Sequence, residues 1–354
     1  MSLPLAKLAV KMIKKNKDEK KKNKQDHIRQ VHAERRSRYA KAIEQLADEK
    51  AAIRLGGIYT LAGLVDEWLA DKSIKDKDDR RKEGQVIINN LCAYIRSPFS
   101  LAEKREIIEA ATTSPYVYSG NLNEDKAKLR EEQEVRQTIF NEISNHLAES
   151  TKKSSTDNYW KYFNYDFSKS KIFYSLNGLT FSNPNFSNTE FTGPANFTGS
   201  RFIGKAIFKN TTFNSLAHFS DIDTAKTTFE AEVDFTGSIF IGDAIFRNTT
   251  FTLDATFSSE TSGRTNFESE SDFSLSTFSH DANFSKGNFH ERANFELSSF
   301  NGITKFRNTH FYGPAQFSVY GGLHISQEYS FAGDADFTNA YFKEGASFTE
   351  RYFE

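Results

Sequence analysis

The chain has 354 residues, near-balanced charge with 46 Lys and Arg against 47 Asp and Glu, and a single cysteine, Cys92. One cysteine excludes an intrachain disulfide, and its apolar neighbours predict a buried thiol in a protein of the reducing cytoplasm. No apolar run approaches the roughly 18 residues that a membrane-spanning helix needs. Residues 1–150 carry 29 basic and 24 acidic residues, whereas residues 151–354 carry 17 and 23, so we expect more than one domain.

Residues 1–35 form a basic leader. Residues 11–41 contain 13 Lys or Arg and only four acidic residues, a composition that favours anionic partners. On a helix, one face carries Leu5, Leu8, Ala9 and Met12, flanked by Lys7, Lys11, Lys14 and Lys15. Two interpretations stay open: a short helix that binds an anionic membrane surface through these four lysines, or a solvated, frayed leader. Direct nucleic-acid binding is not expected, because the stretch lacks aromatic residues that could stack on bases.

Residues 36–155 predict an α-helical domain. Apolar residues recur at helical spacing over 39–46 and again over 53–69, which predicts two antiparallel helices. Gly56-Gly57 lacks the sequence context of a phosphate loop, so we interpret it as a close helix contact. Further helices are expected at 83–96, 101–111 and 125–148, with a charged linker at 71–82 and an irregular one at 113–123. The last helix should turn five residues inward: Leu129, Val135, Ile139, Ile143 and Leu147.

Phenylalanine dominates the remaining sequence. Of the 34 Phe, all but Phe99 and Phe140 lie between Phe163 and Phe353, and from Phe181 to Phe219 they recur every five or six residues. Helices repeat near 3.6 residues and strands repeat at two. A side chain that points inward every five residues therefore predicts a four-sided coil with one short strand per side. The residue two before each Phe also points inward, where only a small side chain fits.

The triplets Ala195-Asn196-Phe197, Ala206-Ile207-Phe208 and Ala335-Asp336-Phe337 illustrate the pattern. In these motifs the chain resembles the pentapeptide-repeat family. The resemblance implies a right-handed quadrilateral β-helix over residues 156–354. Residues 52–64 also resemble the second helix of a HEAT-type repeat and a segment that precedes the repeats in bacterial members. The expected fold class is therefore a multidomain α+β protein in which a HEAT-like helical hairpin domain precedes the β-helix and covers its first coil.

The repeat departs from a plain five-residue pattern in several places. Alternating steps of five and six residues predict wider second corners and a coil of 22 residues. Thr224 and Ser262 stand where Phe is expected, and residues 195–232 and 233–270 share 21 of 38 positions. If Thr224 and Ser262 each occupy a side, that duplicated unit has seven sides. The Phe-free stretch 318–330 predicts a protruding loop, whose Tyr320 and His324 are candidate interaction residues.

The C-terminal coil should expose its edge. The Phe register continues through Phe348 and Phe353, so we expect end-to-end homodimerisation through residues 331–354, with these two residues in the contact. The resemblance implies the same arrangement, because it is known for gyrase-directed family members.

The sequence predicts no catalytic, cofactor-binding or metal-binding residue, and the eight histidines show no ligand spacing and are interpreted as scattered, solvent-facing residues. We therefore expect a non-enzymatic protein–protein interaction or scaffold protein of bacterial type. It would be cytoplasmic and peripheral to the inner membrane through its basic leader. The alternative is a DNA mimic that modulates DNA gyrase or another topoisomerase, which requires dense negative charge along the coil.

Overall fold

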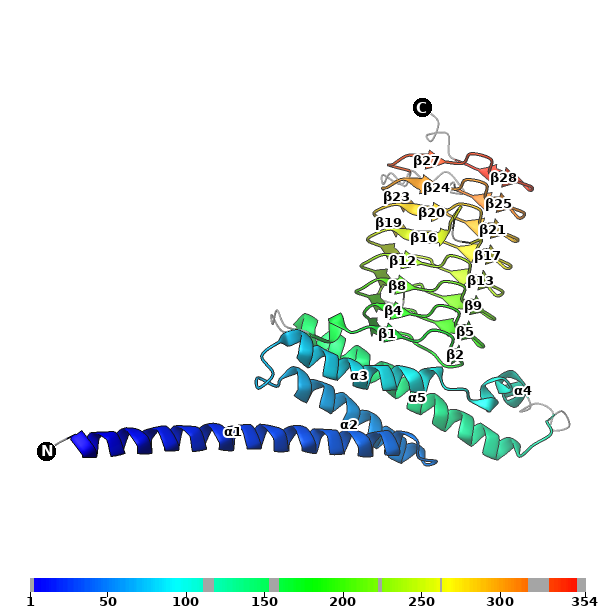
Figure 1. Cartoon of the computed structure of the whole chain (residues 1–354). Coiled ribbons are helices and arrows are strands. Elements are labelled where there is room, and N and C mark those ends of the chain that lie inside the picture. Colours follow the sequence, from blue (N-terminus) through cyan, green and yellow to red (C-terminus); the bar gives the residue numbers. More distant parts are fainter. Residues whose placement is uncertain are drawn as a thin grey trace. The chain divides into compact units, whose positions relative to one another are not determined.

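The computed structural model describes residues 3–110, 118–152, 159–221, 225–261, 263–317 and 331–348. The chain divides into two compact units, Met1–Ile87 and Ile88–Glu354. Figure 1 shows helices in the first part of the chain and stacked short strands in the second. The fold class expected from the sequence is confirmed: a helical N-terminal region precedes parallel-strand sheets with a regular repeat.

The first unit is built on a helical hairpin of α1 (Leu3–Leu46) and α2 (Ala51–Leu69). α1 runs without a break through residue 35, where we had separated the leader from the helical domain. The hairpin is tightly packed at Gly57, because a Cβ atom there would lie 2.9 Å from the Ala42 carbonyl oxygen. The interpretation of Gly57 as a close helix contact is thus confirmed.

The helices that follow differ from the expected set at two places. α3 (Lys77–Arg96) begins inside the predicted charged linker. The Asp76 carboxylate accepts a hydrogen bond from the Asp78 amide at 2.8 Å, so an acidic N-cap starts the helix within a run that had indicated a linker. The expected helix at 101–111 is instead a 3-10 turn, η1 (Ser100–Ala102), followed by α4 (Arg105–Ala110).

α5 (Leu122–Lys152) connects the helices to the coil within the second unit. Its five predicted inward residues, Leu129, Val135, Ile139, Ile143 and Leu147, are all buried. The neighbouring Arg136 is also buried: it pairs with Glu132 at 2.7 Å and donates to the carbonyls of Ile95 and Ser97 at the end of α3. A second 3-10 turn, η2 (Tyr159–Tyr162), leads into the coil.

The coil consists of four parallel sheets in the described residues, named A to D here. Sheet A contains β1 (Tyr165–Asp166), β4 (Pro184–Asn185), β8 (Ala206–Ile207), β12 (Val233–Asp234), β16 (Ala255–Ser258), β20 (Ala282–Phe284), β24 (Thr304–Lys305) and β27 (Ala335–Asp336). Sheet B contains β2 (Lys171–Ile172), β5 (Glu190–Phe191), β9 (Thr212–Phe213), β13 (Ile239–Phe240), β17 (Asn266–Phe267), β21 (Asn288–Phe289), β25 (His310–Phe311) and β28 (Tyr341–Phe342). Sheet D contains β6 (Ala195–Asn196), β10 (Ala217–His218), β14 (Ala244–Ile245), β18 (Ser271–Asp272), β22 (Ala293–Asn294), β26 (Ala315–Gln316) and β29 (Ala346–Ser347). Sheet C contains β3 (Thr180–Phe181), β7 (Arg201–Phe202), β11 (Thr228–Phe229), β15 (Thr250–Phe251), β19 (Thr277–Phe278) and β23 (Ser299–Phe300).

From β4 onward the chain visits the sheets in the order A, B, D, C, so four strands complete one coil. Ala195 pairs with Ala217, a step of 22 residues (217 − 195) that agrees with the predicted coil length. The right-handed sense of the winding stays a prediction.

Two coils are longer because a corner is extended. Ala217 pairs with Ala244, a step of 27 residues (244 − 217), and β10 in sheet D is followed directly by β11 in sheet C. The extra residues between β10 and β11 therefore add no side. The duplicated unit has six sides, not the seven that we expected, because an inserted loop has the length of one side. Thr224 and Ser262 themselves lie outside the described residues.

The interior of the coil is filled by stacked phenylalanines. Phe246 and Phe273, one coil apart, have ring centroids 4.9 Å apart and planes within 1°. Rings on neighbouring sides meet edge to face, as Phe235 and Phe246 do at 5.5 Å and 81°. The small residue two before each Phe is buried too, as Ala244 shows, so the predicted inward pattern is confirmed.

Polar residues of the repeat hold the corners. The carboxylate of Asp234 accepts a hydrogen bond from the Thr236 amide at 2.9 Å, and other outward Asn and Asp residues make the same turn. The buried hydroxyl of Ser238 donates to the Phe208 carbonyl of the preceding coil at 2.5 Å. The five-residue corners also contain a residue with positive φ, such as Gly237 at 76°. The repeat thus satisfies its own backbone at each turn.

Side chains of α5 cover the first coil. Phe140 contacts Phe167 at a centroid distance of 4.6 Å and also approaches Phe181 and Phe186. Phe99 stacks on Phe173 at 5.6 Å. The only two Phe residues outside the repeat therefore both pack against its base.

The same helix also pairs the open backbone of that coil. The carboxamides of Gln133 and Gln137 donate to the carbonyls of Phe173 and Ser175, each at 3.1 Å, and the Ser144 hydroxyl accepts from the Thr180 amide at 2.8 Å. The expected capping role of the helical region is confirmed for α5.

We predict that Phe140→Ala lowers the free energy of unfolding by about 3 to 5 kcal/mol, because it removes a buried ring and leaves a cavity over the first coil. Urea unfolding followed through Trp160, which is buried next to Phe163 at the base of the coil, measures the loss. Ile107→Ala is the control, because Ile107 is 50% exposed. Equal urea midpoints for the two variants would contradict the capping role of Phe140.

Candidate functional site

The lysines predicted to bind an anionic surface lie on the exposed first half of α1. At 100° per residue, Lys7, Lys11, Lys14 and Lys15 fall on one half of the helix circumference. The other half carries Leu8, Val10, Met12 and Ile13, which are 57% to 68% exposed. The structure thus brings the four lysines together beside an exposed apolar strip.

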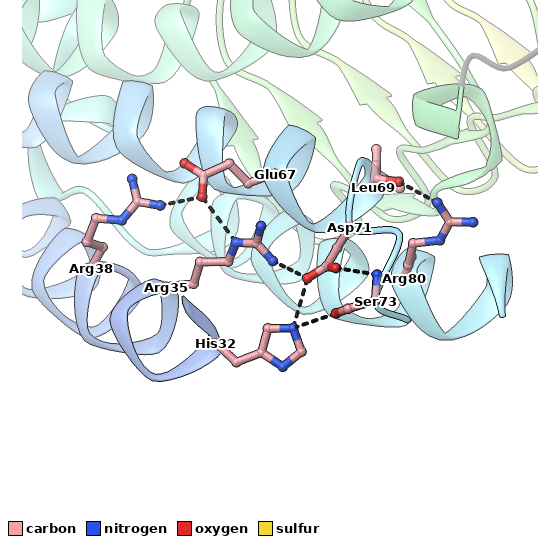
Figure 2. Close-up of polar contacts among 8 residues, drawn as sticks. All are labelled: His32, Arg35, Arg38, Glu67, Leu69, Asp71, Ser73 and Arg80. Atoms are coloured by element: carbon pink, nitrogen blue, oxygen red, sulfur yellow. Dashed lines mark hydrogen bonds and ion pairs between the residues drawn. The ribbon is translucent and has the colours of Figure 1, made fainter. Parts of the chain in front are cut away.

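The second half of α1 is fixed to α2 by ion pairs, shown in Figure 2. Arg35 donates to Glu67 at 3.1 Å and to Asp71, and Arg38 also donates to Glu67. The His32 ring nitrogen Nε2 lies 2.8 Å from Asp71. We call these five residues the α1–α2 clasp.

Neighbouring groups complete the environment of the clasp. The Ser73 amide donates to the Asp71 carboxylate at 2.8 Å, and Arg35 lies 5.0 Å from the centre of the Trp68 ring. His32 also contacts Trp68, with ring centroids 5.1 Å apart. We had interpreted the histidines as solvent-facing, and for His32 this was wrong, because it is turned toward α2 by the hairpin packing.

The clasp holds its carboxylates ionised. Burial alone would raise the pKa of Asp71, but hydrogen bonds from Ser73, His32 and Arg35 outweigh it and hold that pKa well below its usual range. The hydrogen bond from Arg38 lowers the pKa of Glu67. Because these acids are neutralised by neighbouring cations, the clasp stabilises the hairpin and is not arranged for proton transfer.

Cys92 is no nucleophile. Its side chain is 1% exposed, and burial raises the pKa of the thiol to about 12. The predicted buried thiol is confirmed. In the described ranges, no three His, Cys, Asp or Glu side chains are grouped as metal ligands.

The predicted interaction residues of the coil have separate fates. Tyr320, His324 and Phe353 lie outside the described residues. Phe348 stacks on Phe317 with centroids 4.8 Å apart. The strand residues Phe300 and Phe331 pair across the interval that contains 318–330, so the coil resumes in the same sheet after that segment.

The final described coil is less covered than those before it. Ala335 and Ala346 are exposed, whereas their partners Thr304 and Ala315 are buried. Phe348 is half-buried, unlike Phe317 below it. Within the described residues, this end of the stack therefore offers accessible apolar surface.

Outward charges on the coil form pairs between successive coils. Arg201 pairs with Glu230 at 2.6 Å, and Lys209 pairs with Asp234 at 2.9 Å. Such exposed pairs contribute little stability each. They do, however, alternate positive and negative charge along the coil.

One surface feature was missed from the sequence. His290, His310, Tyr312 and Tyr341 gather on the outer face of sheet B, with ring centroids 5.0 to 6.4 Å apart. We call these four residues the aromatic platform. Its signal was present as His and Tyr residues directly beside inward Phe residues, but only the strand register shows that they are neighbours.

The stacked coils with one inward Phe per side define a parallel β-helix of short strands. Residues 176–223 match the family model described as pentapeptide repeats (9 copies). The coil therefore belongs to the pentapeptide-repeat family, as the sequence motifs had indicated. The match ends within the first extended corner, where the regular spacing stops. No curated protein and no solved structure matches the chain. None of the helices in the described ranges is long and apolar enough to cross a membrane.

We predict that Asp71→Asn destabilises the hairpin by about 2 kcal/mol at pH 7, because it leaves Arg35 without its buried carboxylate partner. Since the folded-state pKa of Asp71 is depressed, the stabilisation is present above its unfolded pKa of about 3.9 and is lost as pH falls toward the folded value. The difference between variant and parent should therefore shrink at about pH 3. Urea unfolding followed by Trp68 fluorescence in a Trp160→Phe background measures it.

Asp26→Asn is the control, because Asp26 is half exposed and pairs only with Arg29 on its own helix. A difference between Asp71→Asn and its parent that stays constant from pH 7 to pH 3 would contradict an ionised Asp71 as the source of the stabilisation.

Proposed function

We propose that this chain is a non-enzymatic protein–protein interaction or scaffold protein. The observation that carries the proposal is the filled coil interior, in which buried Phe rings stack without interruption from Phe213 through Phe240 and Phe267 to Phe289. Such an interior leaves a substrate no room, so the coil can act only through its surface. Pentapeptide-repeat proteins commonly act in protein interactions and are generally non-enzymatic.

One partner that we propose is a second copy of the chain, bound at the final coil. The exposed Ala335 and Ala346 and the half-buried Phe348 supply apolar surface for this contact. Its strands also carry unpaired backbone groups, which favour pairing with another chain.

We predict that chemical crosslinking in the native host joins coil lysines to a second protein and also yields a Lys343–Lys343 crosslink, which only two copies can form. Lys343 lies in the final described coil and is exposed. Sedimentation at micromolar concentration should show a dimer that Phe348→Glu converts to a monomer. A monomeric parent protein would refute the homodimer, and the absence of any crosslinked second protein would refute the scaffold function.

We also propose that the first turns of α1 attach the protein peripherally to the anionic inner surface of a membrane. The support is the geometry of α1, with four lysines on one half of the helix and four exposed apolar side chains on the other. A helix of this kind lies in the membrane interface with its apolar side buried among the lipids. Each nearby lysine adds roughly 1 kcal/mol of attraction to an anionic surface.

We predict that reversing Lys7, Lys11, Lys14 and Lys15 to Glu abolishes flotation with anionic vesicles. Reversing Lys20, Lys21, Lys22 and Lys24 is the matched control: it changes the same charge on α1 but away from the exposed apolar strip, and should leave part of the binding. Equal losses would show charge attraction alone. A deletion should stop before His32 to spare the clasp, and unchanged flotation after removal of residues 2–27 would refute the membrane proposal.

The DNA-mimic alternative gains no support from the coil surface. A mimic needs continuous negative charge, whereas Arg201, Lys205 and Lys209 stand against acidic residues of the next coil. We therefore keep the interaction function as the proposal.

A further inference from the structure

The aromatic platform is one continuous group of rings. His290 and Tyr312 follow paired Phe residues of β21 and β25, and their rings stack at 5.0 Å with planes 20° apart. His310 pairs with Tyr341 across β25 and β28, with centroids 6.0 Å apart. His310 also lies 6.0 Å from Tyr312 and nearly parallel to it, which joins the two pairs.

The fold does not require aromatic residues at these positions. In earlier coils of the same sheet, the outward positions hold Thr212, Asn214, Ile239 and Ile241. Cross-strand aromatic pairs add some stability, but stability alone gives no reason to leave Tyr341 49% exposed. Exposed tyrosines grouped on a polar surface are typical of protein interfaces, where they supply rigid contact area.

Carboxylates surround the platform. Glu268 lies 3.7 Å from His290, and Glu270, Glu291 and Glu344 are exposed and form no ion pair with any residue in the described ranges. The nearby cations are fewer. Arg292 donates to Gln316 at 2.7 Å, which leaves Lys343 as the other basic residue at this edge of the sheet.

Aromatic faces attract cations through their negative π surface, and carboxylates beside them strengthen that attraction. Arginine fits this combination better than lysine, because its planar guanidinium stacks on a ring and bonds a carboxylate in two places. The same carboxylates repel the phosphates of a nucleic acid. Charge complementarity therefore selects a basic protein segment as the occupant.

We propose that the aromatic platform docks an arginine-containing segment of a partner protein, with guanidinium groups on Tyr312 and Tyr341 and further cations against the surrounding glutamates. This inference rests on the proposed interaction function and assigns one surface to it. The platform lies on the side of the coil, and the contact is distinct from that proposed between final coils.

Fluorescence anisotropy of labelled nine-residue peptides with the full chain tests the inference. The probes alternate Gly with Arg, Lys or Glu. We expect the Arg peptide to bind more tightly than the Lys peptide and the Glu peptide to show no binding. Two lost cation–π contacts should weaken Arg-peptide binding about 5- to 30-fold in Tyr312→Ala/Tyr341→Ala. Ile239→Ala/Ile241→Ala, at the equivalent outward positions of β13, is the matched control and should bind like the parent.

A second variant guards against unfolding. Tyr312→Leu/Tyr341→Leu keeps apolar bulk on the sheet but removes the π faces, and should lose binding to a similar extent with an unchanged urea midpoint. Peptide binding that survives both double variants, or that shows no preference for Arg over Lys, overturns the inference. So does Tyr-dependent binding of a soluble β-glucan in the absence of Arg-peptide binding. Failure of the peptide test with crosslinked partners present sinks only the platform, whereas the absence of those partners sinks the proposed function.

Discussion

The stacking of each Phe ring on the equivalent ring one coil away is the contact on which the rest of this structure depends. Phe219 and Phe246 stack at 4.8 Å with planes 4° apart, close to the spacing of paired strands. Rings and backbone therefore share one repeat distance along the coil. The inward residue beside each Phe must be small, and corner hydroxyls must bond the Phe carbonyl of the preceding coil. A single coil can satisfy neither condition alone, so stability comes from neighbours.

This dependence explains the role of the second part of the helical region. The first coil has no coil beneath it, so its rings and carbonyls need other partners. α5 supplies an aromatic ring through Phe140 and amide groups through Gln133 and Gln137. The buried Arg136 in turn fixes α5 to the end of α3. In effect, one amphipathic helix replaces a missing coil with both kinds of contact that a coil provides.

The sequence predicted what depends on local period and missed what depends on register. Phe spacing predicted the coil, its inward Ala residues and its 22-residue step, and helical spacing predicted the buried face of α5. The isolated Phe99 and Phe140 were also visible, although their contact with the coil was not. Thr224 was assigned to a side because a five-residue insertion and a five-residue side are indistinguishable along the chain. The clasp at His32 and the aromatic platform bring together residues 20 to 40 positions apart, and no local pattern indicates such neighbours.

The two units use different physical means at their surfaces. In the hairpin, charges of opposite sign gather at Arg35 and Asp71 and fix one helix to another. On the coil, opposite charges are spread in pairs between coils, and the one dense group of side chains is aromatic. An inert interior and a mostly neutralised surface leave few places for strong recognition. Interaction is therefore confined to the unpaired cations of α1, the last coil and the aromatic platform.

The extended corners have a consequence for how such a chain can change. After five additional residues, β11 returns to sheet C in register with β7, and the Phe229 ring still stacks on Phe202 at 4.4 Å. Strand pairing and ring stacking are thus insensitive to the length of the segment that joins β10 to β11. A corner can accept foreign sequence while the sides stay constant. Evolution, or an engineer displaying a peptide epitope, could vary these corners freely without redesigning the aromatic column that supports them.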